Sequence, residues 1–177
     1  ITAIGINIGM IKFKLKDNEN SKDFDNLLEQ IKASISMLTN SYQDLSYITS
    51  NDIIEFMPIE LSISDTVKER IKFFDPMANV NNKNILASIE ENLDAFINRV
   101  ELERLIDNNI SNGIKYAKIG TKIGITLIKN KDTAILEFAT TGKEIIEKTK
   151  VFEKNYRIDT NLQGLGWGLH MVKNICE

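Results

Sequence analysis

The sequence predicts an α+β protein: an antiparallel two-helix hairpin followed by a two-layer α/β sandwich. Two observations support this class. Over residues 1–48 the apolar residues recur at alternating steps of three and four, as in helices that pack against other helices. Beyond residue 58, alternating β-branched segments are interleaved with helical ones, which is typical of helices packed on one sheet.

Composition excludes several classes of function. The net charge of −3 argues against a nucleic-acid partner, because such binders need a basic face. The single cysteine, Cys176, and the single histidine, His170, make a disulfide framework, a thiolate zinc site or a Ser-His-Asp triad hard to assemble. No stretch approaches the length of a membrane span and no signal peptide is present, so we expect a soluble protein of a reducing compartment.

The predicted hairpin covers residues 1–50. Its first helix carries a heptad seam from Ile1 to Leu15, and a polar run separates it from a second amphipathic helix that ends near Ile48. A lone hairpin leaves its seam half exposed, so we expect a homodimeric four-helix bundle. The alternative is a hairpin docked on the rest of its own chain. The chain starts inside an apolar pattern and ends in a helix, so we interpret it as a fragment whose first helix is truncated.

A linker at 51–58 precedes the second predicted domain, at 59–177. Ser62 and Ser64 are the candidate N-caps of its first helix. The expected helices and strands surround one sheet: helices at 63–74, at 100–116 and from about 169, short strands at 85–89 and 95–97, and a hairpin of strands 123–129 and 134–140 around the turn 130–132.

Two stretches of this domain carry candidate chemistry. Asn108, Asn112 and Lys115 form one stripe at the edge of a helix, and amide oxygens with an ammonium suit a metal–phosphate ligand. A solvated polar stripe is the alternative. Glycines 164, 166 and 168 precede the last helix, where backbone N–H groups can approach an anion; the alternative is a plain turn. Arg157 suits bidentate contact with a terminal phosphate, or is a surface arginine.

The order of these motifs resembles the catalytic core of bacterial sensor histidine kinases. Asn108–Tyr116 is similar to the family's N box, Val151–Arg157 to its F box and Gly164–Leu169 to its G2 box. The segment from Ile1 to Ile4 is similar to the residues that follow the phosphoacceptor histidine. By this resemblance the second domain is an ATP-binding domain of the GHKL type, shared with type II topoisomerases and Hsp90.

The resemblance also implies roles for individual residues. Asn112 would ligate Mg²⁺, with Asn108 near the metal and the γ-phosphate, Lys115 on the phosphates and Tyr116 beside the adenine. Further ATP contacts are implied for these residues: Thr140, Gly142, Arg157, Gly164, Gly166, Gly168 and Leu169. The γ-phosphoryl would pass from Mg–ATP to a histidine and then to an aspartate of a response-regulator receiver domain.

Three departures from the family pattern qualify this reading. The phosphoacceptor histidine would lie just upstream of Ile1, and His170 does not replace it. Thr140 stands where the G1 box has an adenine-binding aspartate, and only Gly142 of that box remains. The C-terminal strands of the family domain would lie beyond Glu177.

Two other functions stay open. The weakened G1 box favours a pseudokinase that serves as a scaffold, and another ATPase or kinase of this fold, such as an anti-sigma-factor kinase, is a weaker alternative because it needs no hairpin. The family default for the parent protein is an inner-membrane sensor with this core in the cytoplasm.

Overall fold

A computed structural model describes residue 35 and residues 57–157 and 166–177 of the chain. The chain divides into two compact units, Ile1–Leu45 and Ser46–Glu177, and every element described below belongs to the second unit. The predicted hairpin lies outside the described residues except for Ile35, which is helical. The four-helix bundle and the domain boundaries therefore stay predictions.

A three-stranded sheet in the order β2–β4–β5 forms one layer of the domain. Strand β2 (Asn84–Ile89) runs parallel to β4 (Lys122–Asn130), and β4 pairs antiparallel with β5 (Thr133–Thr140). The β4–β5 turn contains Lys131 at a φ of 56°. The predicted hairpin is therefore confirmed, with β4 extended by one residue at both ends and β5 by one residue at its start.

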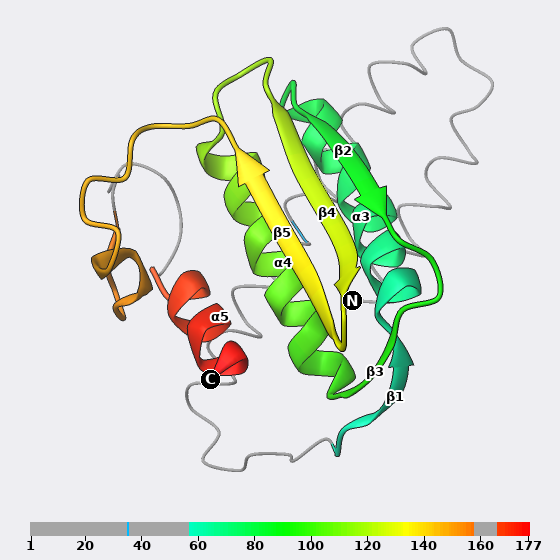
Figure 1. Ribbon diagram of the computed structural model, residues 1–177. Helices are drawn as coiled ribbons and strands as arrows, with labels where there is room; N and C mark the ends of the chain where they lie inside the picture. Colours follow the sequence, from blue (N-terminus) through cyan, green and yellow to red (C-terminus); the bar gives the residue numbers. More distant parts are fainter. Residues whose placement is uncertain (1–34, 36–56, 158–165) are drawn as a thin grey trace, which may run out of the picture. The chain divides into compact units, whose positions relative to one another are not determined.

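Helices α3 (Ile63–Val80) and α4 (Arg99–Tyr116) lie side by side on one face of this sheet (Figure 1). They cover Ile123, Ile125 and Leu127 of β4, which are at most 1% exposed. In the described part of the chain no helix covers the opposite face, where Leu86 and Ile128 are 50% and 44% exposed. This arrangement confirms the two-layer α/β prediction.

A separate two-stranded ribbon pairs β1 (Ile59–Ser62) with β3 (Asp94–Ile97) in antiparallel register. The expectation of one sheet was therefore wrong, and β1 was not predicted at all. β1 has only four residues, Ile59-Glu60-Leu61-Ser62, and its alternation of apolar and polar residues is too short to separate it from the preceding linker and the following helix. Ser62, one of the two candidate caps, is confirmed as the N-cap of α3 and accepts the Asp65 N–H at 3.2 Å.

Helix α3 extends six residues beyond its predicted end at Phe74, from Asp75 to Val80, and passes through Pro76. A proline inside a helix removes a backbone hydrogen bond and costs about 3 kcal/mol, which is why the sequence predicted a stop before it. Phe74, Met77 and Ala78 are at most 5% exposed. Their burial on the last turns offsets the proline cost and keeps the helix continuous.

The other candidate cap, Ser64, holds the turn that leads to β3. Its hydroxyl donates to the Glu90 carbonyl at 2.7 Å and accepts the Leu93 N–H at 3.0 Å. The Ile63 N–H also donates to the Leu93 carbonyl, at 2.8 Å. Ser64 therefore joins the start of α3 to the 90–93 turn, although it is not the cap.

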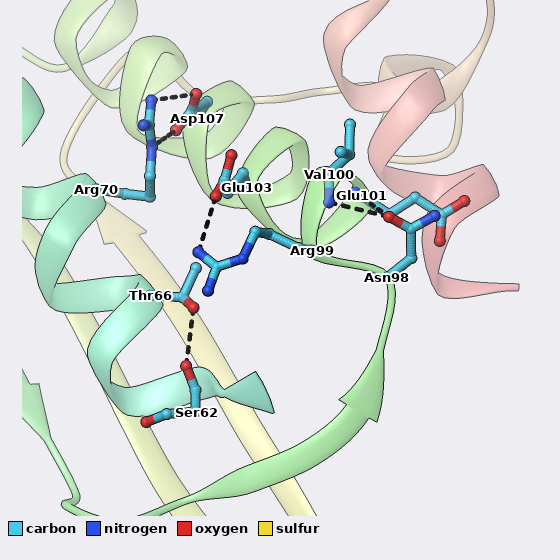
Figure 2. A network of polar contacts seen from close by, with 9 residues as sticks. All are labelled: Ser62, Thr66, Arg70, Asn98, Arg99, Val100, Glu101, Glu103 and Asp107. Atoms are coloured by element: carbon cyan, nitrogen blue, oxygen red, sulfur yellow. Dashed lines mark hydrogen bonds and ion pairs between the residues drawn. The ribbon is translucent and has the colours of Figure 1, made fainter. Parts of the chain in front are cut away.

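An ion pair joins the two helices across the layer. Arg70 of α3 donates to both carboxylate oxygens of Asp107 of α4, each at 2.6 Å, and both side chains are 17% exposed (Figure 2). The Arg70 guanidinium also lies 4.6 Å from the ring centroid of Phe73. Burial raises the pKa of the Asp107 carboxyl above its usual value, against the opposing effect of Arg70. The pair fixes α3 relative to α4.

We expect Asp107→Ala to lower the free energy of unfolding by about 2 kcal/mol, because it leaves the largely buried Arg70 charge without its partner. The control, Glu103→Ala, breaks the Arg99–Glu103 pair, whose side chains are 47% and 31% exposed, and should cost at most about 0.5 kcal/mol. Urea unfolding of both variants measures the difference. Equal losses would show that the Asp107 pair does not join the helices as described.

Candidate functional site

Helix α4 carries the predicted polar stripe. Asn98 caps its N-terminus, accepting the Val100 N–H at 2.9 Å and the Glu101 N–H at 3.4 Å (Figure 2). The apolar face of α4 lies on the sheet: Leu102, Ile106, Ile110 and Ile114 are at most 4% exposed, and Leu105 is half-buried. The observed helix begins one residue before its predicted start.

The stripe lies at the edge of this buried face. Asn108, Asn112 and Lys115 are all half-buried, as their spacing predicted. Asn108 donates through Nδ2 to the Arg104 carbonyl at 3.0 Å, so its Oδ1 stays an acceptor. In the described part of the chain the Asn112 amide has no hydrogen-bond partner. Asn109, the neighbour of Asn108 in sequence, donates through Nδ2 to the Leu105 carbonyl at 2.8 Å. This bond satisfies the amide next to the apolar face of α4.

The glycine motif meets the stripe through helix α5 (Gly168–Cys176), which packs on α4 on the side away from α3 (Figure 1). The contact is very close at Gly168: a Cβ there would lie 2.7 Å from Oδ1 of Asn108. Nδ2 of Asn108 also lies 3.9 Å from Sδ of the buried Met171. Asn108 and Gly168, which are 60 positions apart in the sequence, are therefore neighbours in the candidate site.

The remnant of the G1 box lies at the other end of α4. Ala117 forms a β-bridge with Gly142, and the Lys118 N–H donates to the Thr141 carbonyl at 2.8 Å. A Cβ on Gly142 would lie 2.9 Å from the carbonyl oxygen of Tyr116, so only glycine allows this approach. The predicted adenine-side residues Tyr116 and Gly142 are thus neighbours.

Thr140, which replaces the expected aspartate, ends β5 beside the same helix. It pairs with Ile123 across the sheet, and a Cβ added at Gly113 of α4 would lie 3.2 Å from its methyl group. The residue is exposed. Thr140 therefore lies near both Gly113 and Gly142, and its role beside the adenine stays a prediction.

The polar segment before the second glycine motif packs on the start of α5. The Asn155 N–H donates to the Gly166 carbonyl at 3.1 Å, and Trp167 Nε1 donates to Asn155 Oδ1 at 2.6 Å. Lys154 Nζ lies 3.8 Å from the centroid of the Trp167 ring. We call Lys154, Asn155 and Trp167 the tryptophan clasp. His170 contacts the Phe152 carbonyl through Nδ1 at 3.0 Å.

Arg157 follows this clasp. Its Cγ would lie 3.0 Å from a Cβ at Gly166, whose φ of 72° is a backbone conformation that residues with a side chain rarely adopt.

Upstream of this region, the Glu147 carboxylate accepts from Lys150 at 2.6 Å and from the Tyr156 hydroxyl at 3.2 Å. The Lys150 and Tyr156 hydrogen bonds lower the pKa of Glu147. Gly164, the first predicted glycine, lies outside the described residues.

The arrangement suits an anionic ligand carried with a metal ion. The described residues contain no cluster of three or more His, Cys, Asp or Glu side chains able to hold a metal. Mg²⁺ commonly takes few protein ligands and completes its shell with phosphates and water, so the amide oxygens of Asn112 and Asn108 fit that chemistry. The backbone N–H groups at the start of α5 and the Lys115 ammonium suit the phosphates.

Sequence reasoning missed two features of this region. The tryptophan clasp depends on contacts 12 and 13 positions apart, which no local pattern reports. Lys83, whose ammonium donates to the Ile114 carbonyl of α4, was also missed. A single lysine in a turn gives no signal that it is buried.

Residues 97–177 match the family described as histidine kinase-, DNA gyrase B-, and HSP90-like ATPase. The match contains every predicted site residue. Histidine protein kinase SaeS of Staphylococcus aureus is 26% identical over 179 residues, covering 92% of this chain and 48% of SaeS. The family match and these relatives together support a catalytic core of the bacterial sensor histidine kinase type, and the chain spans about half the length of these curated relatives.

Solved structures show the same fold. Full-length ShkA in complex with AMPPNP superposes with a TM-score of 0.62 at 16% identity, over 89% of this chain and 34% of that chain. The catalytic domain of histidine kinase ThkA gives 0.60 at 21% identity, over 67% and 78%. Acinetobacter baumannii histidine kinase AdeS gives 0.57 at 20% identity, over 96% and 82%. Among the described residues, none of the helices has the length and apolar character to cross a membrane.

The close contact between α5 and α4 gives a test. We expect Gly168→Ala to lower the free energy of unfolding by about 1–3 kcal/mol, because the new methyl group would overlap Asn108 and displace α5. Gly124→Ala is the matched control: its Cβ would meet no atom closer than 3.6 Å, and its effect should stay within about 0.5 kcal/mol. Urea unfolding compares the two, and a tolerated Gly168→Ala would contradict the described packing.

Proposed function

We propose that the chain binds Mg–ATP and transfers the γ-phosphoryl group to a histidine, for relay to an aspartate of a response regulator. The ATPase family of residues 97–177 and the sensor-kinase relatives support this function. The reaction asks the protein mainly to position the phosphates and neutralise their charge, because phosphoryl transfer needs little covalent chemistry from side chains.

One observation carries the proposal: three motifs distant in sequence gather along helix α4. The Asn108 amide contacts the glycine motif at Gly168, and the turn at Tyr116 contacts Gly142. The backbone that we propose to bind phosphate thus adjoins one end of the polar stripe, and the proposed adenine side adjoins the other. A merely solvated stripe would not need glycines at both contacts.

The proposed roles follow this layout. Asn112, whose amide has no partner in the described residues, would ligate Mg²⁺, with Asn108 beside it. Lys115 would contact the phosphates and Arg157 the γ-phosphate. Tyr116 and Thr140 would border the adenine. Glycines 142, 164, 166 and 168, with Leu169, would line the nucleotide.

The assembly is part of the proposal. The helical hairpin predicted at 1–50 would form a homodimer. The receiver domain of the response regulator would dock on this hairpin. The parent protein would be a membrane sensor that holds this core in the cytoplasm. The names of the relatives support the class of protein.

Isothermal titration with Mg²⁺ and AMPPNP tests the function directly. We expect saturable, Mg²⁺-dependent binding, and we expect Asn112→Asp to weaken it by about 100-fold, because a carboxylate repels the phosphates and changes the metal ligand. Asn130→Asp makes the same chemical change on an exposed residue at the β4–β5 turn and should alter the Kd by less than about threefold. Folding of each variant is checked by circular dichroism. Equal effects of the two variants would remove Asn112 from the site.

A second candidate function is a non-enzymatic scaffold with the same fold. The observation that favours it is Thr140, a neutral side chain where the resemblance expects an adenine-binding carboxylate. A neutral acceptor gives an ordinary hydrogen bond instead of a charge-assisted one, which weakens base recognition on the order of 1 kcal/mol.

Thr140→Asp separates the two candidates. For a kinase we expect the wild type to bind AMPPNP and the variant to bind it about tenfold more tightly, since the restored carboxylate makes a charge-assisted bond to the adenine amino group. Thr133→Asp, at the far end of β5, is the control and should leave the Kd unchanged. A folded chain that binds no nucleotide with either residue at position 140 would be a scaffold.

A further inference from the structure

Lys83 is a buried cation that the proposed roles do not use. It lies in the turn between α3 and β2, where Asn82 has a φ of 54° and the Lys83 N–H donates to the Ala78 carbonyl at 3.0 Å. Only 6% of the residue is exposed. Its ammonium donates to the carbonyl oxygen of Ile114, in the last turn of α4.

That carbonyl is one the helix leaves without a partner. The last four C=O groups of an α-helix lack intrahelical donors, and the N–H four residues after Ile114 belongs to Lys118. The Lys118 N–H donates to the Thr141 carbonyl instead, at 2.8 Å. The Lys83 ammonium therefore takes the place of the missing donor, and its charge suits the negative end of the helix dipole.

The turn that Lys83 holds is the one that carries the predicted ligands. Ile114 lies between Asn112 and Lys115 in sequence, and the same turn is fixed from its other side by the bridge between Ala117 and Gly142. The Gly120 N–H also donates to the Asn82 carbonyl, at 3.0 Å, which joins the Lys83 turn to the chain leaving α4.

We infer that Lys83 is a positioning residue of the nucleotide site: by binding the Ile114 carbonyl it holds the last turn of α4 where Asn112 and Lys115 meet the metal and phosphates. This inference rests on the proposed Mg–ATP function. Lys83 itself touches no ligand in this role; it acts through the backbone of α4.

The burial of Lys83 supports a specific role. Burying an ammonium is costly, and lysine is rarely found buried without a partner. Burial lowers the pKa of Lys83. A helix end can be completed without such a cost by a glycine in the left-handed conformation or by water, so closing the helix alone does not require this lysine.

Lys83→Met tests the inference, because it removes the donor and keeps an unbranched side chain of similar length. We expect the Kd for Mg²⁺–AMPPNP to rise about tenfold, as is typical when a residue that orients the ligating side chains is removed. Lys83→Arg, which keeps a cationic donor, should restore most of the affinity. The matched control is Ser62→Ala, which removes the N-cap of α3 and lowers the Tm without touching α4.

The full 177-residue chain is titrated at a temperature where circular dichroism shows every variant folded. An unchanged Kd in Lys83→Met, with a fall in Tm like that of Ser62→Ala, would overturn the positioning role and leave the proposed function intact. A wild-type chain that binds no AMPPNP would overturn the proposed function and this role with it. If Lys83→Met does not fold, Lys83→Leu, which also lacks a donor, takes its place and the same rise in Kd is expected.

Discussion

The domain depends on the close packing of helix α4 against the sheet at Gly113. A Cβ there would lie 3.0 Å from Ile123 and 3.2 Å from Thr140, so glycine sets how near the helix axis comes to β4 and β5. Ile106 and Ile110, both fully buried, continue the same contact along the helix. Because α4 lies this close, Arg70 of α3 reaches it from one side and Gly168 of α5 reaches it from the other. The polar stripe of Asn108, Asn112 and Lys115 lies at the edge of these packed faces of α4 and is half-buried.

Local patterns were enough to predict most of this fold. The β4–β5 hairpin has alternating β-branched residues around a short turn, and α4 has an apolar face with a polar edge, so both were predicted to within a residue. The errors arose where tertiary contacts outweigh local preference. Burial of Phe74, Met77 and Ala78 carries α3 through Pro76, and β1 exists only because it pairs with β3. In both cases the local pattern is short and a stronger local signal, a proline or a preceding linker, outweighs it.

The candidate site divides in the same way. The spacing of Asn108, Asn112 and Lys115 placed them correctly on one edge of α4, because helical geometry alone fixes that relation. Which distant glycine meets which end of the helix came from the family order of motifs and not from the residues themselves. Neither helical spacing nor the family order of motifs could predict the role of Lys83. Its ammonium binds the Ile114 carbonyl oxygen, 31 positions away, which receives no hydrogen bond from the helix itself.

The tryptophan clasp has a practical consequence. Trp167 is the only tryptophan of the chain, and its indole ring is held between a carboxamide at its N–H and an ammonium over its face. Indole emission responds to both kinds of neighbour, so the ultraviolet fluorescence of the unlabelled protein reports from one defined place: the junction of the 150–157 segment with α5. The molecule thus contains a natural optical probe at the edge of its proposed phosphate-binding region.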